Sequence, residues 1–184
     1  MNSIKYLVQL FLMFFVFVGF AQKSTIYSHQ SVNYNSALTL YNKQQFNSAQ
    51  LIFQSVLSST SDSFLKSNAT YYIANCAVML NQPNAKFLLE SFVKDYPYST
   101  KRNSAYFEIA NDYFKSSKYS DACNWYAKVE ANRLLFSDMY YFHFNYGYSL
   151  YKIKKYKNAK LNFNQLLGSK RYASQAKYYM GFMA

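Results

Sequence analysis

The sequence predicts an all-α protein, an α-solenoid in which antiparallel helix pairs stack into a right-handed superhelix. Two observations favour this fold class. A pattern of a small residue, a polar turn and a second small residue recurs four times, and the period-two alternation typical of strands is absent. Gly (4) and Pro (2) are scarce among 184 residues, so we expect few long loops.

The N-terminal segment is predicted to be a targeting signal. Lys5 precedes a nearly unbroken apolar run over 6–20, and Gly19 and Ala21 place small residues where a signal peptidase needs them. We therefore expect a signal peptide over 1–21, a flexible arm over 22–29 and an exported protein. The apolar run is shorter than the roughly 18 residues of a membrane-spanning helix, although retention as a membrane anchor is an alternative.

The repeat has a regular period along the rest of the chain. Its second small position is occupied, at intervals of 36, 37 and 37 residues, by Ala49, Ala85, Ala122 and Ala159. The two helices of each unit are expected to cross closely where the small residues meet, since a larger side chain would separate them. Gly147 and Gly181, at the first small position, should serve this close packing better than they serve helix propensity.

The repeat also predicts where the helices lie. We expect helices over 31–43, 47–59, 62–81, 84–95, 100–117, 120–131, 137–154, 157–167 and 171–184. The last of these would be the first helix of a fifth unit, with apolar residues where a terminal unit should be polar. We interpret the chain as a truncated array of about four and a half repeats; an open docking face is the alternative.

These features resemble the tetratricopeptide repeat family over residues 30–184. The link Asp-Tyr-Pro-Tyr-Ser at 95–99, followed by Ala105, Ile109 and Tyr113, is similar to the subtype found in exported and outer-membrane-assembly proteins of Gram-negative bacteria. The third unit resembles the family best. The second departs most, because Gln82 replaces the aromatic residue and Pro83 opens its second helix, a position that tolerates proline.

Residues for catalysis or metal binding are not evident. Past the predicted signal the histidines are His29 and His143, and the eight acidic residues show no spacing suited to a carboxylate pair or a calcium loop. We predict no enzymatic activity, no catalytic residues, no cofactor and no metal site. Cys76 and Cys123 are interpreted as small buried residues on helices that do not touch; export would also permit a disulfide.

The family resemblance implies a partner-binding groove along the first helix of each unit. Carried onto this sequence, the groove residues are Tyr34, Tyr41, Asn42, Phe107, Asn111, Phe114, Lys115, Tyr141, Phe144, Tyr148, Tyr151 and Lys152. Aromatic rings offer contact area at low entropic cost, and amides hydrogen-bond a peptide backbone. Aromatic stripes at helical spacing are also common as core between helices, which is the competing interpretation.

We therefore expect a scaffold or adaptor in the periplasm or outer cell envelope that binds another envelope protein or an extended peptide segment. Removal of Lys5 with the signal would leave 19 Lys and Arg against 8 acidic residues, so peripheral contact with membrane or cell wall is also expected. The lysines could equally serve to solvate the helix faces. A carbohydrate- or cell-wall-binding module and an auxiliary module of a larger machine are the alternatives; nucleic acid is not expected.

Overall fold

The computed structural model describes residues 30–183. The predicted signal peptide over 1–21, the predicted arm over 22–29 with His29, and residue 184 lie outside this described part. These predictions therefore stay predictions.

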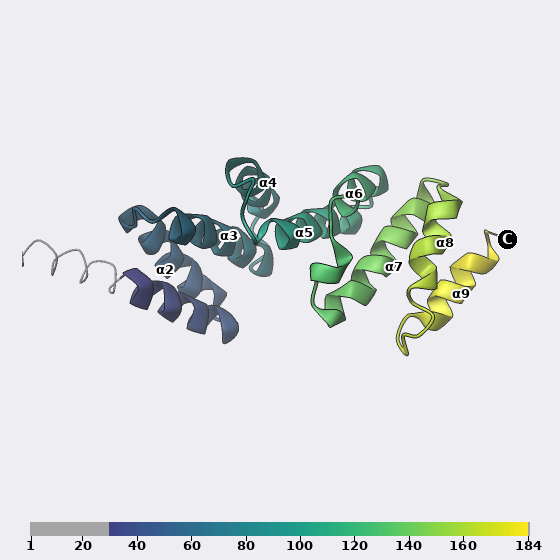
Figure 1. Cartoon of the computed structure of the whole chain (residues 1–184), viewed down its shortest axis with the longest axis horizontal. Helices are drawn as coiled ribbons and strands as arrows, with labels where there is room; N and C mark the ends of the chain where they lie inside the picture. Colours follow the sequence, from purple (N-terminus) through teal and green to yellow (C-terminus); the bar gives the residue numbers. More distant parts are fainter. Residues whose placement is uncertain (1–29, 184) are drawn as a thin grey trace, which may run out of the picture. The chain divides into compact units, whose positions relative to one another are not determined.

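All regular secondary structure between residues 30 and 183 is helical (Figure 1). The elements are a helix over 30–42, α2 (Phe46–Ser59), α3 (Ser63–Met79), α4 (Ala85–Asp95), α5 (Arg102–Lys115), α6 (Tyr119–Tyr126), the short 3-10 helix η1 (Ala131–Arg133), α7 (Phe136–Lys152), α8 (Tyr156–Asn164) and α9 (Ala173–Gly181). The all-α prediction is confirmed. Most predicted helix boundaries agree with the structure to within two or three residues.

Three predicted helices are too long. The ranges 120–131, 157–167 and 171–184 were expected, but α6 ends at Tyr126, α8 at Asn164 and α9 at Gly181. After Tyr126 the backbone N–H groups of Lys128 and Val129 bond to carbonyls only three residues back, and Leu166 does the same after α8. This tightening into 3-10 geometry is a common way for a helix to end, and the side-chain pattern does not reveal it.

Residues 30–183 divide into two compact units, one that ends at Cys76 and one that begins at Ala77. In the first unit the helix over 30–42, α2 and most of α3 share one core. Ala37 and Ala49, both fully buried, belong to it together with Phe53 and Val56. The repeat's two small positions thus lie in the same packed interior, as the sequence predicts.

The second unit has the same construction. α5 packs on α6 and α7 on α8, and Figure 1 shows these as adjacent helix pairs. Ala110 and Ala122 share one core, and a Cβ added at Gly147 would lie 3.2 Å from Phe163 Cε1 on α8. Close packing at Gly147 is confirmed. The same prediction for Gly181 is wrong, because a Cβ there would meet no heavy atom within 4 Å.

One backbone motif closes the turn between the two helices of every repeat. A non-glycine residue with positive φ follows the first helix, and these residues are Gln44 (60°), Asn81 (53°), Ser117 (57°) and Lys154 (62°). In the turn that contains Lys154, the Lys155 N–H donates to the Leu150 carbonyl at 2.9 Å, and the Lys154 N–H donates to the Tyr151 carbonyl at 3.0 Å. This pairing is the Schellman motif, which usually places glycine at the positive-φ position.

Both cysteines are buried free thiols. Cys76 lies in the core of the first unit and Cys123 in that of the second. Burial raises the pKa of each thiol to about 11. The prediction of two small buried residues is confirmed.

Candidate functional site

A cluster of aromatic rings joins α5, α6, α7 and α9 in the second unit. Its members are half-buried, so each ring is partly packed and partly open to solvent. We call this set the tyrosine surface, and it comprises Phe114, Tyr119, Phe144, Tyr148, Tyr151 and Tyr179, with the exposed Lys152 beside it.

Tyr148 is the centre of the tyrosine surface. Its ring centroid lies 5.9 Å from that of Phe114 on α5, 5.6 Å from that of Tyr119 on α6 and 5.3 Å from that of Tyr179 on α9. All three pairs meet edge to face, the arrangement that aromatic quadrupoles favour. Side chains from four helices therefore converge at Tyr148, which lies near the C-terminal end of α7.

The cation beside these rings is placed by helical geometry. Lys152 lies four residues after Tyr148 on α7, so both side chains are on one face. Its Nζ lies 5.7 Å from the Tyr119 ring centroid and 6.0 Å from that of Tyr148, within the range of a cation–π interaction. A positive charge thus lies beside exposed ring faces.

The Tyr148 and Tyr179 phenol groups of this surface remain neutral over a wide pH range. Burial, reinforced by the neighbouring tyrosines, raises the pKa of Tyr148 and of Tyr179 above the ordinary tyrosine value. A neutral phenol both donates and accepts a hydrogen bond. The tyrosine surface can therefore offer apolar area, hydrogen bonds and one adjacent cation to a ligand.

Five predicted groove residues are brought together in this surface: Phe114, Phe144, Tyr148, Tyr151 and Lys152. Sequence reasoning missed Tyr119 and Tyr179. Neither residue was predicted to line the groove, and Tyr179 was expected only within the last helix, over 171–184. Phe46 and Tyr156 open the second helix of two other units, and this aromatic position was the available signal for Tyr119. The placement of Tyr179 against α7 depends on tertiary packing.

Other predicted groove residues lie inside the second unit instead. Phe107 and Asn111 are each only 5% exposed. Phe107 packs against Tyr141, which is half-buried, and Asn111 hydrogen-bonds Tyr126. Their helix face is covered by the next repeat, so these positions form core and not an open groove wall. Lys115 is exposed at the end of α5.

The predicted groove residues of the first unit form a smaller cluster. Tyr34 and Tyr41 are half-buried and pack around Tyr72, at centroid distances of 6.4 and 5.1 Å. The Tyr41 hydroxyl donates to the Asn75 side-chain oxygen, and Asn42 is exposed. Tyr34 and Tyr72 also pack on Phe53, so these rings contribute to the core of the first unit.

The described residues contain no group of three or more histidine, cysteine or acidic side chains placed to hold a metal ion. His143 is half-buried against Phe142, and its Nδ1 lies 3.0 Å from Asn162 Oδ1. Its contacts are those of a packing residue. Between residues 30 and 183 no helix is both long and apolar enough to cross a membrane.

Comparisons with known proteins support the repeat. The tetratricopeptide repeat model matches residues 68–99, and no curated protein matches the sequence. Among solved structures, two of a MamA point mutant and one of MamA AMB-1 each align with a TM-score of 0.63. They share 16%, 19% and 18% sequence identity, and the alignments cover 84% of this chain and 80%, 86% and 80% of theirs. The predicted fold class, a tetratricopeptide-type α-solenoid, is confirmed.

Proposed function

We propose that this chain is a non-catalytic scaffold that binds a protein partner through the tyrosine surface. A tetratricopeptide-type solenoid suggests protein–protein interaction, because its helix pairs present an extended surface. The observation that carries the proposal is the convergence of half-buried rings around Tyr148, with Lys152 alongside. Rings already held by their neighbours lose little further freedom when a ligand packs on them.

The ligand that this surface suits best is an extended segment of a protein. Open ring faces accept apolar side chains, and the phenol groups can bond to backbone amides and carbonyls. Lys152 adds a preference for a segment with an acidic residue nearby. We propose that the partner belongs to the cell envelope, because Lys5 and the apolar run that follows it are typical of an export signal.

A double variant tests the binding surface. Tyr148→Ala with Tyr151→Ala should abolish the capture of specific proteins from an envelope extract, while Phe64→Ala with Phe87→Ala should not. Phe64 and Phe87 are 66% and 68% exposed and lie outside the tyrosine surface, so this control is a matched loss of two aromatic side chains. Far-ultraviolet circular dichroism of each variant would verify that the helices persist.

The same variants distinguish the alternative, a carbohydrate- or cell-wall-binding module. In that case the protein would sediment with purified cell-wall polymer, and the double tyrosine variant would not, while no protein would be captured. Binding that disappears at high salt yet survives loss of both tyrosines would contradict an aromatic binding surface of either kind.

Export has its own test. Residues 1–30 fused to a reporter enzyme that is active only outside the cytoplasm should give reporter activity in a Gram-negative host. Mass spectrometry of the released fusion should show a new N-terminus at Gln22. A reporter without activity would contradict the envelope location, and an active but uncleaved fusion would favour the membrane-anchor alternative.

A further inference from the structure

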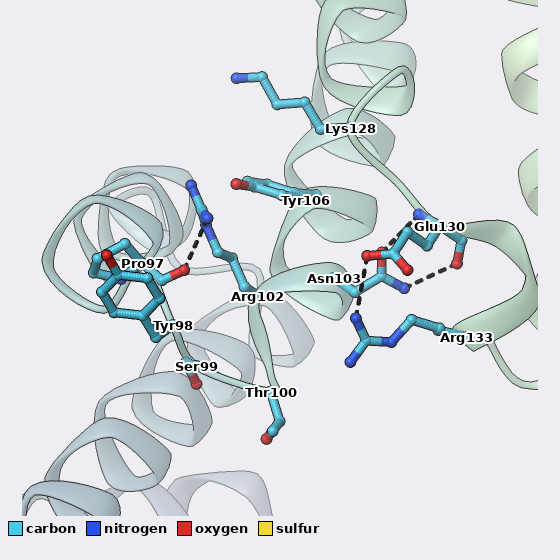
Figure 2. Close-up of a pocket in the computed structure, with 10 residues that line it drawn as sticks. All are labelled: Pro97, Tyr98, Ser99, Thr100, Arg102, Asn103, Tyr106, Lys128, Glu130 and Arg133. Carbon is cyan, nitrogen blue, oxygen red and sulfur yellow. Dashed lines mark hydrogen bonds and ion pairs between the residues drawn. The ribbon is translucent and has the colours of Figure 1, made fainter.

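A pocket that is separate from the tyrosine surface lies in the second unit. It has a volume of about 250 Å³ and is lined by the link over 97–100, the start of α5 and the segment after α6. Figure 2 shows Arg102, Tyr106 and Lys128 on one side of this pocket and the pair Glu130 and Arg133 on the other. None of its lining residues belongs to the tyrosine surface.

The pocket carries a surplus of positive charge. Three cations line it, and Glu130 is its one acidic residue. The Glu130 carboxylate pairs with Arg133 at 3.1 Å. Arg102 and Lys128 have no carboxylate partner within the part of the chain that the structure describes. Two cations are therefore available to an anion entering from solvent.

Arg102 is held in place by contacts that leave its charge uncompensated. Its Nη1 donates to the Pro97 carbonyl at 2.8 Å, and its guanidinium carbon lies 5.1 Å from the Tyr106 ring centroid. Its Nε–H is buried and has no hydrogen-bond partner among residues 30–183. A buried donor without an acceptor is uncommon in folded proteins, so the contacts of Arg102 leave part of its hydrogen-bonding capacity unused.

The neighbouring groups are fixed as well. Lys128 Nζ lies 3.8 Å from the Trp125 ring centroid and 5.8 Å from that of Tyr106. The Asn103 side chain donates to the Glu130 carbonyl at 3.1 Å, and the Glu130 N–H donates to Asn103 Oδ1 at 2.8 Å. These two bonds clamp the segment after α6 onto α5, so both cations keep their spacing before any ligand arrives.

We propose that this pocket binds a carboxylate side chain of an acidic segment of a protein partner, with Arg102 as the main contact. A guanidinium matches the planar carboxylate geometrically as well as electrostatically. Glu130 disfavours a second negative charge, so a monoanion is preferred to phosphate. Tyr98, 97% exposed on the rim, offers a ring to the residues that adjoin the bound acid. This site extends beyond the tyrosine surface and does not depend on it.

The test uses the full chain and a defined probe. A capped hexapeptide containing two glutamates, its glutamine counterpart and inorganic phosphate would be titrated separately by isothermal calorimetry. We expect the glutamate peptide to bind and the other two to bind at least ten-fold more weakly. Arg102→Gln should weaken peptide binding about ten-fold or more, and Lys128→Gln a few-fold, because an ammonium is a point charge without the paired donors of a guanidinium.

Lys157→Gln is the matched control, since it removes the same charge from an exposed residue of α8 outside this pocket. It should leave the peptide affinity unchanged. Equal weakening by Lys157→Gln and Lys128→Gln would overturn the proposal, as would a preference for phosphate. Circular dichroism would establish that Arg102→Gln is folded; if it is not, the Lys128→Gln and Lys157→Gln comparison decides alone. Intact peptide binding in the Tyr148 and Tyr151 double variant would separate this site from the proposed scaffold surface.

Discussion

Tyr126 on α6 donates a hydrogen bond to Asn111 on α5, with 2.7 Å between its hydroxyl oxygen and Asn111 Oδ1. Asn111 Oδ1 also accepts a hydrogen bond from Asn145 Nδ2 on α7, at 3.4 Å. All three side chains are buried. One amide oxygen thus connects three consecutive helices, and its neighbours supply the partners that a polar group needs in an apolar interior.

Removing either side of this bond should destabilise the protein by different amounts. Tyr126→Phe deletes one donor and should lower the free energy of unfolding by about 1 kcal/mol. Asn111→Leu should cost about 2–3 kcal/mol, because it leaves the Tyr126 hydroxyl buried without its acceptor. Urea denaturation followed by circular dichroism measures both, with the exposed Tyr98→Phe as control. Equal losses for the two variants would contradict the proposed role of the bond.

The two glycines of α7 and α9 should respond oppositely to alanine. Alanine favours helix by up to about 1 kcal/mol over glycine, so Gly181→Ala should be neutral or stabilising. At Gly147 the new Cβ would lie 3.2 Å from both Asn162 Cβ and Phe163 Cε1, so overpacking of about 1–3 kcal/mol opposes that gain. We therefore expect Gly147→Ala to lower the melting temperature and Gly181→Ala not to lower it. Equal shifts in both variants would contradict close packing at Gly147.

The positive-φ residues of the turns should accept glycine with a gain in stability. Lys154 adopts φ 62°, a conformation that costs a residue with a Cβ about 1 kcal/mol. Lys154→Gly should therefore raise the free energy of unfolding by roughly 0.5–1 kcal/mol. Lys157→Gly, which removes the same side chain within α8, should lower it by about as much. Thermal and urea denaturation would measure both, and a loss of stability in Lys154→Gly would contradict the prediction.

Much of the fold could be predicted from the sequence because the repeat pattern reflects contacts between residues that are close together in the chain. The alanine spacing depends on contacts within one unit, so the helix pairs could be placed without tertiary information. The turn conformation was harder to predict. Gln44, Ser117 and Lys154 occupy positive-φ positions where glycine, the usual residue, would have indicated the turn.

The candidate sites were predicted less well, because exposure depends on which neighbour covers a helix face. Phe107 and Phe114 are the same residue type two turns apart on α5. Phe107 nevertheless lies in the core, while Phe114 contributes to the tyrosine surface. The pocket around Arg102 is lined by residues from the link over 97–100, from α5 and from the segment after α6. These three stretches share no sequence pattern that would predict a common site.

Stability should also fall at alkaline pH because both cysteines are buried. Each thiol has a pKa of about 11 in the folded protein, against an ordinary value near 8.5 in an unfolded chain. The folded state therefore favours the protonated thiol. This contribution is complete below about pH 8.5 and is progressively lost as the pH rises toward 11, since the unfolded state then releases protons that the folded state retains.

Urea denaturation from pH 7 to 11 would measure this loss, and the double variant Cys76→Ala with Cys123→Ala isolates it. Alanine removes the titrating groups, so the variant's free energy of unfolding should depend less on pH than that of the original chain. The comparison is clearest between pH 8.5 and 10, because burial raises the pKa of Tyr34 to about 12 and raises that of Tyr126 as well, so these phenols contribute mainly above this range. A difference between the two proteins that stays constant from pH 7 to 10 would contradict the assignment to the thiols.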